Sequence, residues 1–358
     1  MRRSLWAAVL MTLVMIAVGI ISASAAPPAQ TGDGAATATA RALNLATLTT
    51  RPTPTPLVYA IRAGQTRVLK ILVDPNGISA IGVDSTGRIY VGNGTDRVYV
   101  LGPDLETVRT FGAIQPYAIT VTKRDEVLVS QRNQVMISAY DPEGKYLREF
   151  WSYPNAQLET MAAAPDGTVY VLWQTLYTPR VANLTRLDAQ GNVIYSREFG
   201  RARDGVGAVH SVSAAPDGKR ISITFSGFEQ TVGDTISILR DYSVEGDPIF
   251  NDATLIFDSP LYAPTLALRL ADNSLVLFTD NAVGWWTSDR KPRIILGGYV
   301  LRAGSLQQFS RARRGGMALR PDGYSAAYAE VNIDGELLVG IVSFEDYSGR
   351  SPTPTPAN

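Results

Sequence analysis

Between residues 57 and 350 the chain repeats one arrangement: a short alternating run of apolar and polar residues, a tight polar turn, and a second alternating run. A period of two places successive side chains on opposite faces, which is typical of β-strands and not of an amphipathic helix. Residues 89–91 and 97–101 are thus predicted to form neighbouring strands. No long amphipathic helix pattern separates the strands, which argues against a parallel α/β sheet.

The polar turn recurs six times, at intervals of roughly 38 to 55 residues, and four-stranded propeller blades have periods close to these. The sequence therefore predicts an all-β protein, a β-propeller with six four-stranded blades, or seven in the alternative. The last unit, 317–344, lacks an outer strand, and we expect an N-terminal strand to complete it and close the ring. The turns are Ser85-Thr86-Gly87, Lys123-Arg124-Asp125, Pro165-Asp166-Gly167, Pro216-Asp217-Gly218, Ala271-Asp272-Asn273 and Pro321-Asp322-Gly323.

Several units resemble known repeats. The segments 81–91 (IGVDSTGRIYV) and 161–171 (MAAAPDGTVYV) resemble the inner half of an NHL-type blade, and 213–219 (SAAPDGK) is similar to the WD-type propellers of exported bacterial proteins. This resemblance extends over residues 78–345 and implies the propeller fold. It includes no functional motif, and propellers host unrelated functions.

The two ends of the chain differ from the repeats. Residues 1–25 contain two arginines, an apolar run and an Ala-Ser-Ala site, a pattern typical of a secretory signal peptide; an uncleaved membrane anchor is the alternative. Residues 26–56 and 351–358 are rich in Thr and Pro, which predicts a disordered linker and tail around a propeller at 57–350. We therefore expect a secreted or cell-envelope protein.

The composition narrows the chemistry. With 33 basic and 33 acidic residues, the formal net charge is zero, so no global field favours nucleic acid as a partner. The absence of cysteine excludes disulfides, thiol nucleophiles and cysteine-ligated metals. A single histidine also excludes a histidine-rich zinc site. We expect no bound cofactor, and contact with a membrane only through an uncleaved signal segment.

Alignment of the six turns selects one residue per unit for the mouth of the central channel. Counting back eight residues from the last turn position gives Ser79, Tyr117, Glu159, His210, Thr265 and Gly315. Glu159 and His210 then lie in neighbouring blades at one level. Such a pair is a candidate proton-transfer couple or a binding site for a polar group. The alternative is a structural histidine that forms a hydrogen bond across the channel.

Arginines and aromatic residues give further binding candidates. Arginine forks suit carboxylate, sulfate or phosphate groups, although pairing with local acids is the alternative. Trp151 is expected in a loop entering the third unit, where its ring could present a flat face to a sugar; packing against the next blade is the alternative. Together with Tyr117, the candidates at the channel mouth are Trp151 and the arginines of two loops, Arg201, Arg203, Arg311, Arg313 and Arg314.

These features favour an exported propeller that acts as a binding or scaffold module for a protein, a glycan or an anionic polymer. The alternative is a lactonase-like hydrolase or lyase that holds a divalent cation such as Ca²⁺ with carboxylates at the channel mouth. In that case Glu159 and His210 are the catalytic candidates. Glu159 is the one Ca²⁺-type ligand in the aligned set, and no ring of Asn and Asp accompanies it.

Overall fold

The computed structural model describes the strands, their turns and most of the short connections of the repeat region. The chain divides into two units, 1–56 and 57–358, and the predicted signal peptide, linker and C-terminal tail lie outside the described residues. The described residues are 59–71, 73, 80–131, 135–177, 180–201, 206–229, 234–249, 254–257, 264–279, 282–286, 292–297, 299–302, 305–308, 316–331 and 336–346.

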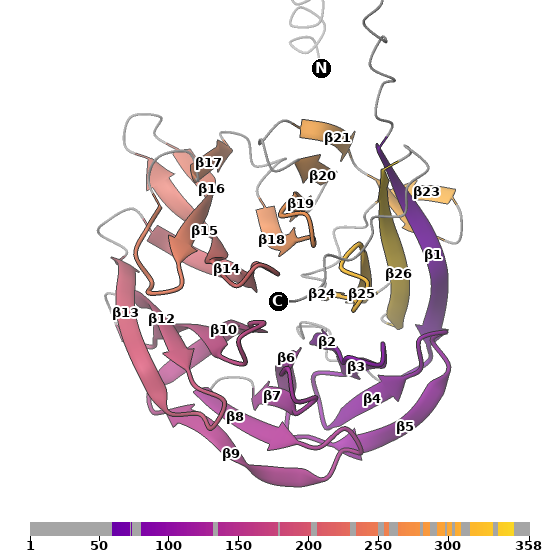
Figure 1. Ribbon diagram of the computed structural model, residues 1–358, viewed down its shortest axis with the longest axis horizontal. Helices are drawn as coiled ribbons and strands as arrows, with labels where there is room; N and C mark the ends of the chain where they lie inside the picture. Colours follow the sequence, from indigo (N-terminus) through magenta and orange to yellow (C-terminus); the bar gives the residue numbers. More distant parts are fainter. Residues whose placement is uncertain are drawn as a thin grey trace, which may run out of the picture. The chain divides into compact units, whose positions relative to one another are not determined.

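Six four-stranded antiparallel sheets form in this part of the chain, and Figure 1 shows them arranged in a ring. The protein is therefore a β-propeller, as the repeated turns predict. Five sheets contain strands that are consecutive in the sequence: β2 (Ile81–Val83), β3 (Ile89–Gly92), β4 (Arg97–Leu101) and β5 (Thr107–Gly112); β6 (Pro116–Val121), β7 (Val127–Gln131), β8 (Val135–Tyr140) and β9 (Tyr146–Tyr153); β10 (Ala156–Ala163), β11 (Val169–Thr175), β12 (Val181–Leu187) and β13 (Val193–Arg201); β14 (Val206–Ala214), β15 (Arg220–Glu229), β16 (Asp234–Ser243) and β17 (Thr254–Phe257); β18 (Pro264–Arg269), β19 (Leu275–Thr279), β20 (Ala282–Trp286) and β21 (Pro292–Gly297).

The sixth sheet joins the two ends of the repeat region. Its strand order is β1-β26-β25-β24, and β1 pairs antiparallel with β26 from Tyr59↔Asp346 to Leu69↔Leu337. This confirms the predicted closure by an N-terminal strand, which gives the last blade its outer strand. A separate hairpin of β22 and β23, which the sequence pattern does not predict, precedes β24 in the chain. The bounds are β1 (Tyr59–Leu69), β22 (Tyr299–Arg302), β23 (Ser305–Gln308), β24 (Gly316–Leu319), β25 (Ser325–Val331) and β26 (Leu337–Asp346).

The same turn connects the innermost strand of every sheet to the strand beside it. Its last residue has a φ between 60° and 89°, and its N–H donates to the carbonyl three residues earlier at 2.9–3.0 Å. Glycine fills this position four times, and Asp125 and Asn273 fill it in the second and fifth sheets. Asp and Asn tolerate the left-handed region better than other non-glycine residues, so one backbone shape repeats despite the change of residue.

Apolar side chains pack between neighbouring sheets, including at the closure of the ring. Ile89 and Val91 of the first sheet belong to one buried cluster with Ala327 and Val339 of the sixth. Both Ile89 and Val91 have no exposed surface. Full burial of a side chain of this kind contributes about 1.5–3 kcal/mol, so the closure is stabilised by packing as well as by the pairing of β1 with β26.

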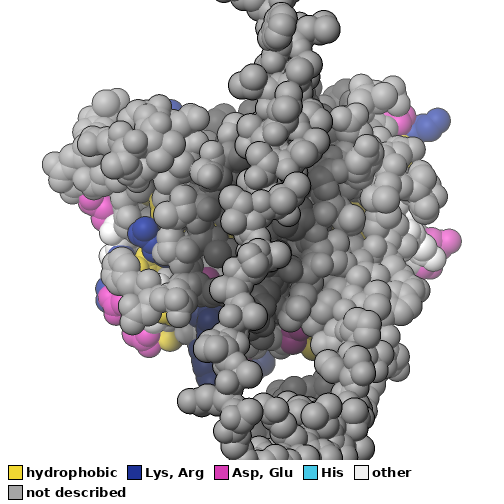
Figure 2. Space-filling model, turned by 90° about the horizontal axis from the view of Figure 1, so that it is seen from above, with side chains coloured by type: hydrophobic (Ala, Val, Ile, Leu, Met, Phe, Trp, Pro, Cys, Tyr) yellow, Lys and Arg dark blue, Asp and Glu magenta, His cyan; other side chains and the backbone are white. Residues whose placement is uncertain are grey.

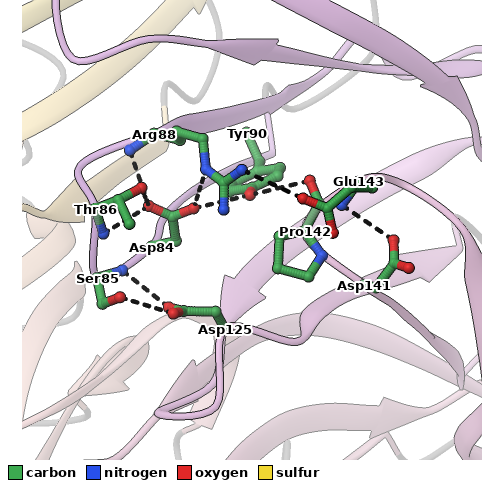
Figure 3. A network of polar contacts seen from close by, with 9 residues as sticks. All are labelled: Asp84, Ser85, Thr86, Arg88, Tyr90, Asp125, Asp141, Pro142 and Glu143. Carbon is green, nitrogen blue, oxygen red and sulfur yellow. Dashed lines mark hydrogen bonds and ion pairs between the residues drawn. The ribbon is translucent and has the colours of Figure 1, made fainter.

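Polar networks add directional contacts between sheets. In Figure 3 the buried Asp84 accepts hydrogen bonds from Arg88 Nε (2.6 Å) and Tyr90 OH (2.9 Å), while Arg88 also approaches Glu143 of the second sheet at 3.7 Å. Ser85 donates through its backbone N–H and its hydroxyl to Asp125, at 2.9 and 2.7 Å. These contacts fix the first two sheets to each other on the face of the propeller where the repeated turns lie.

Candidate functional site

A cavity of about 700 Å³ occupies the centre of the ring. The innermost strand of each sheet contributes to its wall: β2, β6, β10, β14, β18 and β24. Figure 1 shows these six strands nearest the centre. The volume falls within the range of pockets that take small organic molecules, about 300–1,000 Å³.

Three of the residues selected by the turn alignment line this cavity. Glu159 lies on β10 and His210 on β14, which are first strands of neighbouring sheets, and Tyr117 lies on β6. Glu159 and His210 are partly exposed, whereas the Tyr117 side chain is buried. Ser79 and Gly315 lie outside the described residues. The cavity wall is otherwise rich in Ala, Val, Ile, Leu and Met, and its other charged residues are Asp84, Lys123, Asp125 and Arg320.

Each of these residues occupies a β-bulge. The pairing of β10 with β11 passes from Leu158 to Thr160 and omits Glu159, and that of β14 with β15 passes from Val209 to Ser211 and omits His210. The register of β6 shifts between Pro116 and Ile119, around Tyr117, and that of β18 shifts across Thr265. Four neighbouring sheets thus carry the irregularity at the same position.

A bulge redirects the side chain of its extra residue, and bulges are frequent beside functional sites. In a regular strand, successive side chains alternate between the two faces. Glu159 and His210 are the residues left out of this regular pairing, and both line the cavity. The same irregularity therefore marks the cavity residues Tyr117, Glu159 and His210 in three sheets.

Hydrogen bonds hold the inner strands around this site. Ser130 Oγ accepts from the N–H of Ala118 at 2.9 Å, beside the bulge of β6. Between sheets, the N–H of Ala163 donates to Thr120 Oγ1 at 3.0 Å. The N–H of Ala267 donates to Ser211 Oγ at 3.2 Å, next to His210. These contacts satisfy backbone groups that lie outside the regular ladder, and they limit movement of the wall.

The predicted location of Trp151 is wrong. Strand β9 continues to Tyr153, so Trp151 lies within a strand and not in a loop. Its ring is partly buried against the hydrophobic cluster between the second and third sheets, as in the packing alternative. The exposed ring of this segment is Tyr153, with 44% of its surface accessible. The alternating pattern around Trp151 predicts a strand, but it does not determine the residue at which that strand ends.

The arginine loops contribute little to the described structure. Arg201 is the last residue of β13, and its side chain is not among those described. Arg203, Arg311, Arg313 and Arg314 lie outside the described residues, so the predicted anionic patch stays a prediction. On the face in Figure 2, the coloured basic and acidic side chains of the described residues are interspersed around the rim.

The described residues do not supply the donors for a metal centre. Among them, no group of three or more His, Cys, Asp and Glu side chains lies close enough together to hold a metal ion. Glu159 and His210 alone do not make a set of carboxylate ligands of the kind that Ca²⁺ requires.

Within the described residues, the protein has no helix with the length and apolar character needed to cross a bilayer.

Comparison with known proteins identifies the architecture alone. Neither a protein-family model nor a curated protein matches this chain. Among solved structures, the PQQ-bound aldose sugar dehydrogenase from Streptomyces coelicolor has a TM-score of 0.53 at 13% identity, covering 81% of this chain and 99% of that one. A gluconolactonase from Xanthomonas campestris has a TM-score of 0.52 at 13% identity, covering 83% and 99%. Virginiamycin B lyase from Staphylococcus aureus, a catalytically inactive form with quinupristin, has a TM-score of 0.52 at 11% identity, covering 79% and 99%. At these identities the likeness shows the β-propeller fold and no shared activity.

Proposed function

We propose that this protein is a hydrolase or lyase that takes a small molecule into its central channel, with Glu159 and His210 as its acid–base groups. The observation that carries the proposal is that Glu159 and the single histidine of the chain, His210, line the same cavity, each at a bulge of neighbouring inner strands. A cavity with a predominantly apolar wall and a few convergent polar groups is the usual form of a small-molecule site.

The solved propellers with comparable folds support a small molecule as the ligand. Their names designate a gluconolactonase, a virginiamycin B lyase and an aldose sugar dehydrogenase. A fold alone does not determine activity, so they bear on the size of the ligand and not on its identity.

The two side chains have complementary chemistry. A neutral imidazole accepts a proton near neutral pH, and its protonated form donates one. A glutamate carboxylate accepts a proton in the same way. In a hydrolysis, one group would take the proton of the attacking water and the other would protonate the departing oxygen. In an elimination, one would remove a proton next to a carbonyl and the other would protonate the leaving group.

A binding or scaffold module without catalysis is the second candidate. The apolar cavity wall favours it, because this wall can retain a ligand without any chemical step. The arginine loops that we predict beside the channel suit an anionic or macromolecular partner. Both their position and this partner stay predictions.

Turnover of a substrate panel separates the two candidates. The panel contains lactones, aryl esters and eliminable carbonyl compounds, tested against the wild type and the variants Glu159→Gln and His210→Gln. Glu149→Gln, an exposed carboxylate on the neighbouring strand β9, is the matched control. We expect each channel variant to lower kcat/KM by about 10²–10⁴, because each removes one proton-transfer group. Binding without turnover, or full activity in both channel variants, would contradict the enzyme proposal.

A further inference from the structure

We propose that an aromatic platform beside the channel mouth binds sugar rings, and that the substrate is therefore a neutral carbohydrate chain. The platform consists of Tyr153 supported by Trp151 and Trp173. This inference rests on the proposed function, because it names the substrate class of the same site.

The platform is an exposed ring held by two others. Tyr153 stacks on Trp151 with ring centroids 6.2 Å apart and an interplanar angle of 29°. It also contacts Trp173, with centroids 4.4 Å apart and an angle of 37°. Trp173 is 3% exposed, and its Nε1 donates to Thr185 Oγ1 at 2.9 Å, so the supporting ring is fixed. Tyr153 thus presents a large surface in a single orientation, which reduces the entropy lost when a ligand binds.

The chain connects this platform directly to the strand that carries Glu159. Tyr153 ends β9, and the turn Pro154-Asn155 leads into β10, on which Glu159 follows. Leu158, the residue before Glu159, pairs with Trp173 across the ladder. Tyr153 of the second sheet and Trp173 of the third therefore meet beside the strand that carries Glu159.

The surroundings select a neutral ligand with both apolar and hydroxylated surfaces. Asn155 follows Tyr153 by two residues, and its carbonyl accepts a hydrogen bond from the N–H of Leu176 at 3.2 Å. Leu176 and Tyr177 are 50% and 64% exposed. The two segments that contain the platform and these residues, 153–158 and 173–177, include no charged side chain. A flat aromatic ring packs against the C–H face of a sugar, whose hydroxyl groups can then reach polar partners at the edge.

The spacing favours a chain over a single sugar. Trp173 lies on the second strand of its sheet, about 4.8 Å from the inner strand in the hydrogen-bonding direction. The Tyr153 ring centroid lies 4.4 Å from that of Trp173. The exposed ring and Glu159 thus lie on different strands, β9 and β10, and a ligand that contacts both has to be a chain of sugars.

Hexasaccharide binding tests the inference. The probes are cellohexaose, xylohexaose, mannohexaose and chitohexaose, with affinity measured by calorimetry for the full chain. We expect at least one to bind, and Tyr153→Ala to weaken it at least tenfold. Tyr146→Ala is the matched control, because Tyr146 is a 54% exposed tyrosine on the same strand that contacts another buried ring, Tyr140. We expect its affinity to equal that of the wild type.

The variants also separate this inference from the proposed function. Glu159→Gln should still bind the hexasaccharide but lose its turnover. If no neutral glycan binds, or if Tyr153→Ala and Tyr146→Ala bind equally well, the platform inference is wrong. Turnover of a panel compound with no glycan affinity would then leave the enzyme proposal intact. Tight glycan binding with no loss of turnover in Glu159→Gln would overturn the enzyme proposal and keep the platform.

Discussion

Replacing Tyr90 by Phe tests the polar network that joins the first two sheets. Tyr90 OH donates to Asp84 Oδ2 at 2.9 Å, and the Asp84 side chain has no exposed surface. Burial, followed by the hydrogen bond to Asp84, raises the pKa of Tyr90, so its hydroxyl remains a proton donor. Hydrogen bonds to charged groups contribute about 1.5–3 kcal/mol, and we expect Tyr90→Phe to lower the free energy of unfolding by that amount.

Tyr170 provides the matched comparison. It occupies the equivalent strand of the third sheet, is equally buried, and its hydroxyl lies 3.4 Å from the neutral carbonyl of Val244. Loss of a long hydrogen bond between neutral groups should cost at most about 1 kcal/mol. Urea unfolding at neutral pH, followed by tryptophan fluorescence, measures both losses. Equal losses in Tyr90→Phe and Tyr170→Phe would refute the role assigned to Asp84.

The stability loss caused by Tyr90→Phe should also depend on pH, in a direction set by the pKa of Asp84. Burial raises the pKa of the Asp84 carboxyl, but hydrogen bonds from Thr86, Arg88 and Tyr90 lower it, and the net shift in the folded protein is downward. The stabilisation is therefore present above the unfolded-state pKa and is lost as the pH falls through the folded-state pKa. The penalty of Tyr90→Phe should shrink over this acid range. A penalty independent of pH would contradict a charged acceptor.

Three further sets of changes test the packing between and within the sheets. Arg269→Met should destabilise the fold by up to about 3–5 kcal/mol in urea unfolding, because it removes the 2.5 Å partner of the buried Asp241 and leaves it Ser222 Oγ at 2.6 Å and Arg220 at 3.8 Å, and Asp241→Leu in the same chain should restore more than half of the loss. Gly167→Ala should cost about 1–2 kcal/mol, since φ is +89° and the site has room for a methyl group. Gly191→Ala should cost clearly more, because its φ is +93° and the new Cβ would overlap the carbonyl oxygen of Phe150; equal melting temperatures of the two glycine variants would contradict this. Deletion of β1 should leave β26 as a free edge and produce soluble aggregates in size-exclusion chromatography, and a monomer of wild-type stability would refute the closure.

The repeated turn makes the fold predictable from the sequence. Asp125 and Asn273 stand where other units have glycine, and they still give the correct register because their backbone has the same positive φ. The turns also identify Tyr117, Glu159 and His210 as cavity residues, since each lies a constant number of residues before its turn.

The bulges and the aromatic contacts cannot be predicted in this way. A bulge omits a residue from pairing with a partner strand, and periodicity along one strand does not record that partner. The exposed position of Tyr153, next to the partly buried Trp151, depends on where β9 ends and on contacts with Trp173 in another sheet. Sequence spacing alone contains neither fact.

The double variant Glu159→Gln/His210→Gln tests the central claim most directly. The measurement is kcat/KM of the wild type, both single variants and the double variant on one substrate of the panel. Groups that act as one unit are strongly non-additive, so the account predicts that the double variant loses little more activity than either single variant. Fully additive losses, or a double variant as active as the wild type, would contradict an acid–base couple in the channel.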